Sequence, residues 1–172
     1  MSSDTFVLLY KSLVRSHLEY AVSVWSPSRL QDIEKLEKVQ KRATRMIKQL
    51  KNYSYEARLK WLNLPILKYR RLRGDMIQVY NIVSGKYKTN PTVNFNLCHV
   101  SNTRGNMYNM HLSHMHYNLR KYFFCNRVVQ VWNSLPNTVV SAESTNIFKN
   151  RLDQFWCNQD IRLNWNADIT GT

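Results

Sequence analysis

Acidic residues are scarce in this sequence and lie far apart. Asp and Glu together number 11 against 25 Lys and Arg, so the net charge is +14 over 172 residues. A metal-dependent polymerase or nuclease needs at least two carboxylates close together to hold the ions that stabilise the attacking and leaving oxygens. Because the acids here are scattered along helical patterns, we do not expect the chain to be an enzyme.

Glycine and cysteine are also sparse. The four glycines form neither a GxGxxG pattern nor a Walker-type loop, which excludes a phosphate-cradling site of either kind. Cys98, Cys125 and Cys157 are an odd number at wide spacing, without a CxxC pair. This usage argues against a disulfide framework and fits a reducing compartment.

Long hydrophobic runs are missing as well. A membrane-spanning helix needs about 20 consecutive apolar residues, and no stretch of the sequence approaches that length. The first residues lead into a charged, aromatic-rich segment, unlike the apolar core of a signal peptide. With 44% hydrophobic and 12% aromatic residues, the chain is expected to fold, as a soluble intracellular protein with no membrane partner.

The most informative stretch is Ser28–Lys51, whose pattern predicts an amphipathic helix. Ser28 with Gln31 three residues later has the spacing of a capping box, which places the helix start just after Pro27. At about 100° per residue, the apolar residues fall within an arc of roughly 140° and predict a core-facing stripe. The stripe consists of Ile33, Leu36, Val39, Ala43, Met46, Ile47 and Leu50.

The opposite arc of this helix is cationic, and Glu34 and Glu37 are the acids interleaved there. Each glutamate stands four residues before a lysine, a spacing worth about 0.3 kcal/mol of helix stability. Cationic helix faces are common, and many serve only as solvated surface. From Arg29 to Arg73, however, the chain holds 14 Lys or Arg and 4 Asp or Glu. This surplus favours a surface that binds polyanions.

Two groups of basic residues are the candidate nucleic-acid contacts. One is a row on the Ser28–Lys51 helix, and the other is a cluster on the next long helix that would act as a second grip. The row consists of Lys38, Lys41, Arg42, Arg45 and Lys48, and the cluster consists of Arg70, Arg71 and Arg73. Such contacts read shape and phosphate, and each one adds about 0.9 to the slope of log affinity against log salt concentration.

The remaining patterns predict a mainly α-helical fold. Apolar residues at helical spacing predict helices over Phe6–Val24, Tyr53–Leu62 and Pro65–Val83, with Ser54 as a cap and Gly85 as a stop. The first helix should fold back on the second as an antiparallel pair. The aromatic residues of these helices are expected in the core, with base stacking as the less favoured role. They are Tyr10, Tyr20, Trp25, Trp61, Tyr69 and Tyr80.

Beyond Lys86 the composition shifts to Asn, Thr, His and Met, which predicts a polar loop. One or two short strands, or a β-hairpin, are expected around Thr92–Val100 and Met107–Leu112. A last helix should run from about Ser144 to Cys157. The predicted organisation is an antiparallel helical bundle over 1–87, the loop over 88–120, a small helical module over 121–157 and a frayed tail over 158–172.

Six residues in or near this loop are of types that bind zinc: Cys98, His99, His111, His114, His116 and Cys125. A finger-like site needs two ligands from each side at compatible reach, and this spacing matches no tight pattern. An ordinary polar loop is therefore favoured over a metal site, and no metal or other cofactor is assigned.

Six blocks of the sequence occur in a recognisable order. They are LYKSLVRSHLEYAVSVWSP (Leu9–Pro27), DIEKLEKVQKRATRMI (Asp32–Ile47), YEARLKWLNLPILKYRRLRGDMIQVY (Tyr55–Tyr80), TRGN (Thr103–Asn106), WNSLP (Trp132–Pro136) and FKNRLDQFW (Phe148–Trp156). Together they resemble the region that follows the catalytic domain in reverse transcriptases of LINE-type (non-LTR) retrotransposons, near the jockey-like group. The resemblance covers almost the whole chain.

This resemblance implies that Met1 to about Tyr87 corresponds to the helical thumb, which grips the template–primer duplex in these RNA-directed DNA polymerases. The partners it implies are an RNA–DNA or DNA duplex and the palm and fingers of a reverse transcriptase. The location it implies is the nucleus or a cytoplasmic ribonucleoprotein, if the parent mobile element is active. The palm's aromatic-x-Asp-Asp motif and the upstream endonuclease are missing, so we expect a non-catalytic fragment in which Met1 begins a truncated or secondary reading frame.

Two other functions compete with this interpretation. The apolar surface that meets the palm in the family would, in a fragment, be available for docking another protein or for self-association without nucleic-acid binding. A basic amphipathic helix lying on an anionic membrane is disfavoured, because packing against neighbouring helices explains the apolar stripe better.

Overall fold

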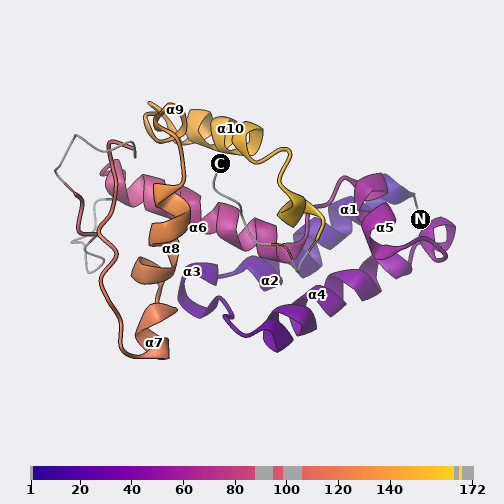
Figure 1. Cartoon of the computed structure of the whole chain (residues 1–172). Coiled ribbons are helices and arrows are strands. Elements are labelled where there is room, and N and C mark those ends of the chain that lie inside the picture. Colours follow the sequence, from indigo (N-terminus) through magenta and orange to yellow (C-terminus); the bar gives the residue numbers. More distant parts are fainter. Residues whose placement is uncertain (1, 88–94, 99–105, 165–166, 168–172) are drawn as a thin grey trace. The chain divides into compact units, whose positions relative to one another are not determined.

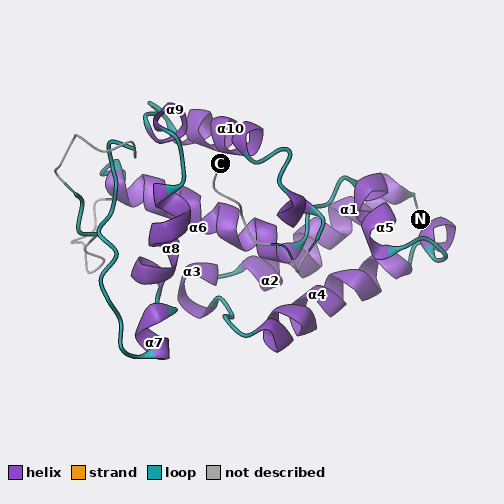
Figure 2. Ribbon diagram, in the orientation of Figure 1, coloured by secondary structure: helices purple, strands orange, loops and turns teal. Residues whose placement is uncertain are grey.

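The computed structural model of the chain describes residues 2–87, 95–98, 106–164 and 167. Within these residues the regular structure is helical, which confirms the prediction of a mainly α fold (Figure 1, Figure 2). No helix in this described part is both long enough and apolar enough to cross a membrane.

The described residues form two compact units. Unit 1 comprises 2–72 with 160–164 and 167, and unit 2 comprises 73–87, 95–98 and 106–159. The boundary lies inside one long helix, α6 (Leu67–Val83), whereas the sequence analysis divides the chain after residue 87. The two ends of α6 have different partners, because Leu67 N donates to Glu37 in unit 1 while Tyr80 stacks on Phe148 in unit 2.

The first predicted helix is interrupted in unit 1. It consists of α1 (Ser3–Leu9), a π-helical turn (Tyr10–Arg15), α2 (Ser16–Glu19) and α3 (Val22–Trp25). A π-helical turn is wider than an α-helical turn and shifts the side chains that follow it around the axis. Ala21 then adopts a left-handed backbone conformation, with φ of 49°, between α2 and α3. A regular helical period therefore does not describe this segment.

The burial of the first segment differs from the single buried face that the predicted helix over Phe6–Val24 would have. Phe6 and Tyr10 are buried and stack on each other, with ring centroids 5.9 Å apart. Leu9 and Leu13, which stand at helical spacing from Phe6, are exposed together with Leu8. An apolar surface therefore remains uncovered on this part of unit 1.

The basic helix of the sequence analysis is α4 (Leu30–Arg45), followed by a 3-10 turn (Lys48–Leu50). Arg29 is its N-cap and makes no side-chain capping bond, so the predicted capping box at Ser28 is wrong. Ile33, Ile47 and Leu50 of the predicted stripe are buried, but Val39 and Met46 are 40% and 72% exposed. The buried side of α4 is mostly polar and consists of Ile33, Glu37, Gln40 and Thr44.

The ends of the next two helices follow the predicted signals. The Ser54 hydroxyl accepts a hydrogen bond from Ala57 N at 3.2 Å and caps α5 (Tyr55–Leu62). Asn63 ends α5 in the left-handed region, with φ of 48°. Gly85, with φ of 65°, ends α6. Gly85 N and Lys86 N donate to the carbonyls of Ile82 and Asn81, a Schellman arrangement that favours glycine at this position.

The predicted frayed tail is wrong for the residues that the structure describes. A 3-10 turn (Asp160–Arg162) buries Ile161 in unit 1. The Arg162 carbonyl accepts a hydrogen bond from Ile66 N at 3.1 Å, and the Ala167 carbonyl accepts one from Lys68 Nζ at 2.8 Å. One buried isoleucine and these two hydrogen bonds thus hold a segment whose composition alone predicts a frayed end. Residues 165–166 and 168–172 lie outside the described residues.

Unit 2 contains the second half of α6 together with α7 (Asn118–Lys121), α8 (Phe124–Asn133), α9 (Asn137–Val140) and α10 (Thr145–Phe155). Its core contains Trp132 from α8 and Phe148 from α10, both fully buried. The Tyr80 ring lies 4.4 Å from that of Phe148, and its hydroxyl donates to the Ala142 carbonyl. Helix α10 starts and ends within two residues of the bounds predicted for the last helix, Ser144 to Cys157.

The predicted strands are reduced to a single antiparallel bridge between Leu97 and Met110. No strand is present among the described residues, and much of the predicted Thr92–Val100 segment lies outside them. Side chains replace the missing ladder, because the Asn133 amide donates to the Met110 carbonyl at 2.8 Å and accepts from Met110 N at 2.9 Å. The loop is therefore held by α8.

Asn106 joins two of the sequence blocks quoted above. Its amide nitrogen donates to the carbonyls of Trp132 and Leu135, at 3.0 and 3.2 Å, and its oxygen accepts from Tyr108 N at 3.0 Å. The last residue of TRGN is thus bound to WNSLP. A buried amide that satisfies three backbone groups is costly to replace.

We expect Asn106→Asp to destabilise the chain by about 2 to 4 kcal/mol, because it removes the amide that donates to both carbonyls and places a carboxylate beside them. Urea denaturation followed by circular dichroism measures the effect. Asn118→Asp, an exposed substitution of the same kind in α7, should change the stability by less than about 0.5 kcal/mol. Equal effects of the two substitutions would contradict the assignment.

Candidate nucleic-acid interface

A buried polar network fixes how α4 is turned in unit 1. Glu37 accepts hydrogen bonds from the Tyr55 hydroxyl and, at 3.1 Å, from Leu67 N at the start of α6. Gln40, one turn later, accepts from the Tyr10 hydroxyl at 2.7 Å and donates to Tyr55 Oη and the Pro65 carbonyl, both at 3.1 Å. Since these bonds come from three other segments, α4 cannot rotate without breaking several of them.

The electrostatics of this network agree with its burial. Burial raises the pKa of Glu37 above its ordinary value of 4.5, although the Tyr55 hydrogen bond, the Leu67 N–H and the nearby charge of Arg71 act in the opposite direction. Burial and the Glu37 charge raise the pKa of the Tyr10 and Tyr55 phenols as well, so both remain proton donors. The helical pattern predicted Glu37 on the cationic face, and that prediction is wrong.

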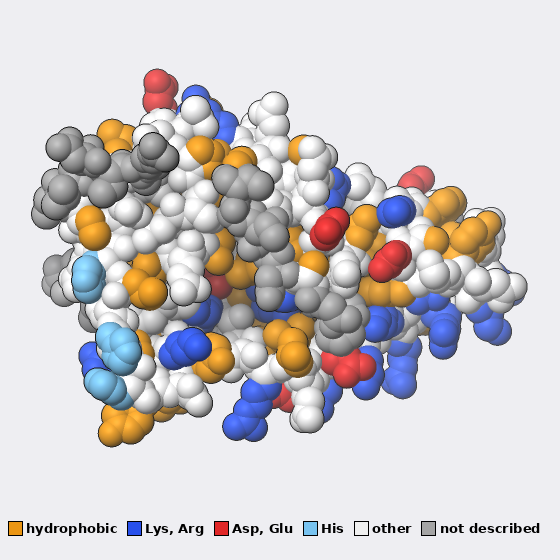
Figure 3. Space-filling model, in the orientation of Figure 1, with side chains coloured by type: hydrophobic (Ala, Val, Ile, Leu, Met, Phe, Trp, Pro, Cys, Tyr) orange, Lys and Arg blue, Asp and Glu red, His pale blue; other side chains and the backbone are white. Residues whose placement is uncertain are grey.

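With Glu37 and Gln40 inside, the predicted row lies on the outer side of α4. Lys38, Arg42, Arg45 and Lys48 are exposed. Lys38 lies 3.4 Å from Glu34, whereas Lys41 is partly covered and lies over the Tyr55 ring, 5.4 Å from its centroid. Lys and Arg side chains gather along the edge of unit 1 formed by α4 and the turn after it (Figure 3). The structure thus brings the row together.

The surplus of positive charge is greatest in the second half of α4. The stretch from residue 38 to residue 55 contains six Lys or Arg and no Asp or Glu. Arg42 and Arg45 stand in the last turn of α4, where cations are favoured by the helix dipole by about 0.3 to 1 kcal/mol. That stabilisation explains two of the charges but not the accumulation of six.

Arg58 of α5 adds to this positive potential, and the sequence analysis missed it. Its guanidinium is buried and donates to the Thr44 hydroxyl at 3.2 Å and to the Tyr53 carbonyl at 3.0 Å, both neutral groups. Burial lowers the pKa of Arg58, and the charge of Arg45 lowers it further. Because these hydrogen-bond partners are neutral, they do not cancel the charge of Arg58, which adds to the positive potential at the nearby surface of α4 and α5.

The predicted second grip is placed differently by the structure. Arg70 makes a bidentate pair with Glu19, at 2.8 and 2.7 Å, and Arg71 is buried close enough to Glu37 to lower its pKa. Arg73 belongs to unit 2 and makes a bidentate pair with Asp153, with its Nη2 at 2.7 Å. These three guanidiniums therefore have carboxylate partners, whereas Arg42, Arg45 and Lys48 of the row make no ion pair within the described part of the chain.

The aromatic residues divide between core and surface. Tyr10, Tyr69 and Tyr80 are buried, as predicted. Tyr20, Trp25 and Trp61 are exposed, and for them the prediction of a core position is wrong. The exposed residues stand next to breaks or helix ends, where a helical period carries little information about burial.

The His and Cys residues of the polar loop do not gather into a ligand set among the residues that are described. No group of three or more His, Cys, Asp or Glu that could hold a metal ion is found there, and His99 lies outside the described residues. His114 and His116 stand edge to face with ring centroids 5.0 Å apart.

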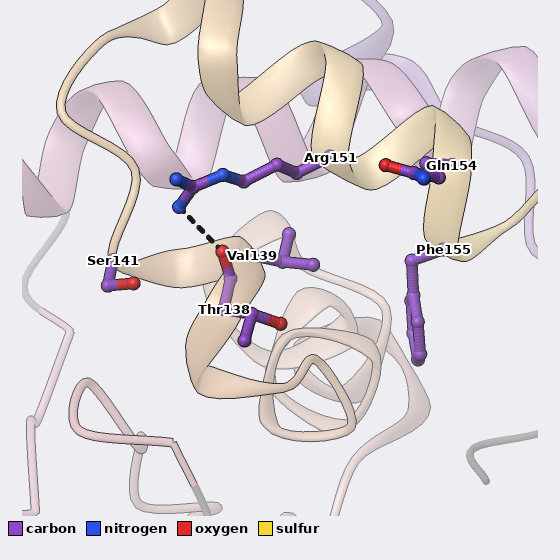
Figure 4. Close-up of a pocket in the computed structure, with 6 residues that line it drawn as sticks. All are labelled: Thr138, Val139, Ser141, Arg151, Gln154 and Phe155. Atoms are coloured by element: carbon purple, nitrogen blue, oxygen red, sulfur yellow. Dashed lines mark hydrogen bonds between the residues drawn. The ribbon is translucent and has the colours of Figure 1, made fainter.

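A hollow of about 580 Å³ lies between α9 and α10 in unit 2 (Figure 4). Arg151 extends over it and donates to the Thr138 carbonyl at 2.7 Å, while Val139, Ser141, Gln154 and Phe155 complete the lining. The lining includes no carboxylate, imidazole or thiol that would serve as a general base. The hollow therefore lacks the side chains of a catalytic centre.

Comparison with family models, with curated proteins and with solved structures finds no match to this chain.

Replacing Glu37 by Gln should change how stability depends on pH. The raised pKa means that the folded chain holds this proton more tightly than the unfolded chain, so the stability contributed by Glu37 is greatest below pH 4.5 and falls as pH rises through the folded-state pKa. Urea denaturation at several pH values should show wild type losing stability relative to Glu37→Gln as the pH rises. Glu34→Gln, at a half-exposed position, is the control. A pH-independent difference would contradict the assignment.

Proposed function

We propose that this chain is a non-catalytic, thumb-like fragment of a LINE-type reverse transcriptase that binds a template–primer duplex through the exposed cationic side of α4. The observation that carries the proposal is the combination of a helix oriented by buried hydrogen bonds with a row of exposed cations in a stretch, 38–55, that contains no acid. The order of the six sequence blocks supports the origin of the fragment. RNA–DNA hybrid and DNA duplexes are the intended ligands.

The geometry of the row suits a phosphate backbone. Lys38, Arg42 and Arg45 follow one another at spacings of four and three residues, which places them on one side of α4 over about 10 Å of helix axis. Lys48 extends the row past the end of the helix. A duplex carries one phosphate per strand for about every 3.4 Å of its axis, so a row of this length faces several phosphates at once.

The proposal assigns duplex contact to the α4 row and a structural role to the arginines of α6. Using Arg70 or Arg73 on a phosphate would break a bidentate carboxylate pair, and using Arg71 would uncover a buried guanidinium. Each of these changes has an electrostatic cost that the exposed residues of the row avoid.

The row variant Arg42→Gln, Arg45→Gln, Lys48→Gln tests the proposal. Fluorescence anisotropy on an RNA–DNA hybrid should show affinity reduced at least about tenfold at low salt, and a slope of log affinity against log salt that is smaller by about two to three. The control variant Lys11→Gln, Lys60→Gln, Lys149→Gln removes the same charge elsewhere and should retain most of the slope. Equal losses of affinity in both variants would mean that the row acts only through net charge, which would contradict the proposal.

A second candidate function is protein docking or self-association, and a specific observation favours it. Leu8 is 69% exposed and Leu13 is 64% exposed on neighbouring turns of the first segment, with Leu9 also uncovered. Uncovered leucines that lie together are typical of an interface. In the resemblance, this segment directly follows the palm, which makes the palm or a second copy of the chain the expected partner.

Sedimentation velocity tests this second function. The wild-type chain should sediment faster as its concentration rises, whereas Leu8→Gln, Leu13→Gln should sediment at a constant rate and still bind duplex. Val24→Gln, at another exposed apolar position of unit 1, is the control and should behave as wild type. A wild-type chain that remains monomeric at all concentrations would argue against a docking role for these leucines.

A further inference from the structure

Unit 2 carries a second cationic region that the α4 row does not include. The 67 residues from 76 to 142 contain no Asp or Glu, and they contain six Lys or Arg and four His. Of the two carboxylates that flank this stretch, Asp75 is buried and paired with Arg127 at 3.1 and 3.2 Å, whereas Glu143 is exposed at the far end. Anions that approach this region therefore meet no exposed negative charge from the described residues of the stretch.

Aromatic residues stand among these cations at α7. Tyr117 is 78% exposed, Phe123 is 61% exposed and Tyr122 is 43% exposed. Arg120 and Lys121 lie between them and are exposed, and the Lys121 ammonium is 5.7 Å from the centroid of the Tyr122 ring. Hydrophobic, His and basic side chains occur together at the α7 end of unit 2 (Figure 3). Exposed rings on either side of cations are typical of surfaces that bind single-stranded nucleic acids.

A pocket of about 450 Å³ opens beside these residues, within the size range of small-ligand sites. Tyr122 and Lys121 line it from α7 and its end, Asn126 and Gln130 from α8, and His114 and Met115 from the preceding loop. Its wall is held in place, because Asn126 donates to the Arg120 carbonyl at 2.6 Å and Arg127 is fixed by Asp75. The pocket thus has one aromatic wall, a cation and two amides.

The two amides offer different groups to the edge of a base. The Asn126 amide nitrogen already donates to the Arg120 carbonyl and to the Met115 sulfur, so Asn126 offers its oxygen as an acceptor. Asn126 and Gln130 are four residues apart on α8 and therefore lie on one side of the helix. The Gln130 side chain makes no hydrogen bond within the described part of the chain, so its donor and acceptor are available to a ligand. Amide side chains match the mixed donors and acceptors of nucleobase edges.

We propose that this pocket binds one unpaired nucleotide of a single-stranded nucleic acid, with the base stacked on Tyr122 and facing Asn126 and Gln130. Lys121 and Arg120 contact the flanking phosphates, and Tyr117 and Phe123 offer stacking surfaces for neighbouring bases. The site lies wholly within unit 2 and does not depend on duplex binding by α4.

The first test changes the ligand and leaves the wild-type chain intact. Fluorescence anisotropy compares a 12-nucleotide oligo(U) or oligo(dT) with an abasic strand of the same length and charge. We expect the abasic strand to bind about five- to a hundredfold more weakly, which corresponds to the loss of one or two stacked bases. Equal binding of the two strands, or no binding of either at low salt, would overturn the proposal.

The second test uses matched variants of the exposed segment. Tyr122→Ser should lower the affinity for oligo(U) about five- to a hundredfold, and Tyr122→Phe should retain it, because a phenyl ring also stacks. Leu119→Ser, at a position that is 90% exposed in the same segment, should bind as wild type. If Leu119→Ser loses as much affinity as Tyr122→Ser, the segment is an apolar docking surface and the proposal fails. Thermal unfolding of each variant confirms that it folds.

The same measurements separate this site from the duplex site. The row variant Arg42→Gln, Arg45→Gln, Lys48→Gln should keep the abasic discrimination of wild type, whereas Tyr122→Ser should keep its affinity for the RNA–DNA hybrid. A row variant that loses the discrimination between base-bearing and abasic strands would place single-strand binding on α4 and overturn the unit 2 site.

Discussion

The carboxylate of Glu37 is the group on which unit 1 depends. It lies fully buried in α4, and it accepts hydrogen bonds from the Tyr55 hydroxyl and from Leu67 N at the start of α6. A carboxylate is favoured at a helix N-terminus, where backbone N–H groups lack partners within the helix. Gln40 repeats the arrangement one turn later with Tyr10 and the Pro65 carbonyl. The side of α4 that carries Glu37 and Gln40 therefore faces the core, and the side that carries the basic row faces solvent.

The sequence predicts the existence and ends of most helices well, because caps and stops are local signals. Ser54 caps α5 and Gly85 ends α6 as predicted, because the residues next to them in the sequence are enough to identify a cap or a stop. The face that α4 buries was harder to predict, because hydrophobic periodicity cannot recognise a buried side that is mostly polar. Val39 and Met46 accordingly lie outside, although their spacing is that of core residues.

The candidate sites show the same limit. The exposed α4 row follows from charge pattern alone, whereas the environment of the α6 arginines depends on acids distant in sequence. Arg70 meets Glu19 and Arg73 meets Asp153, pairings that no local pattern reveals. Arg58 was missed because nothing in the sequence around a single helical arginine shows that its side chain is buried. Charge counts therefore locate a region, and the structure decides which cations in it are exposed.

The most direct measurement of the central claim is photo-crosslinking of the chain to an RNA–DNA hybrid. A photoreactive amino acid replaces either Met46, which is 72% exposed beside the α4 row, or Leu8, an exposed residue of α1 in the same unit. The account predicts crosslinks from position 46 that disappear at high salt, and none above background from position 8. Crosslinks from position 8 alone, or equally from both positions, would contradict duplex binding through α4.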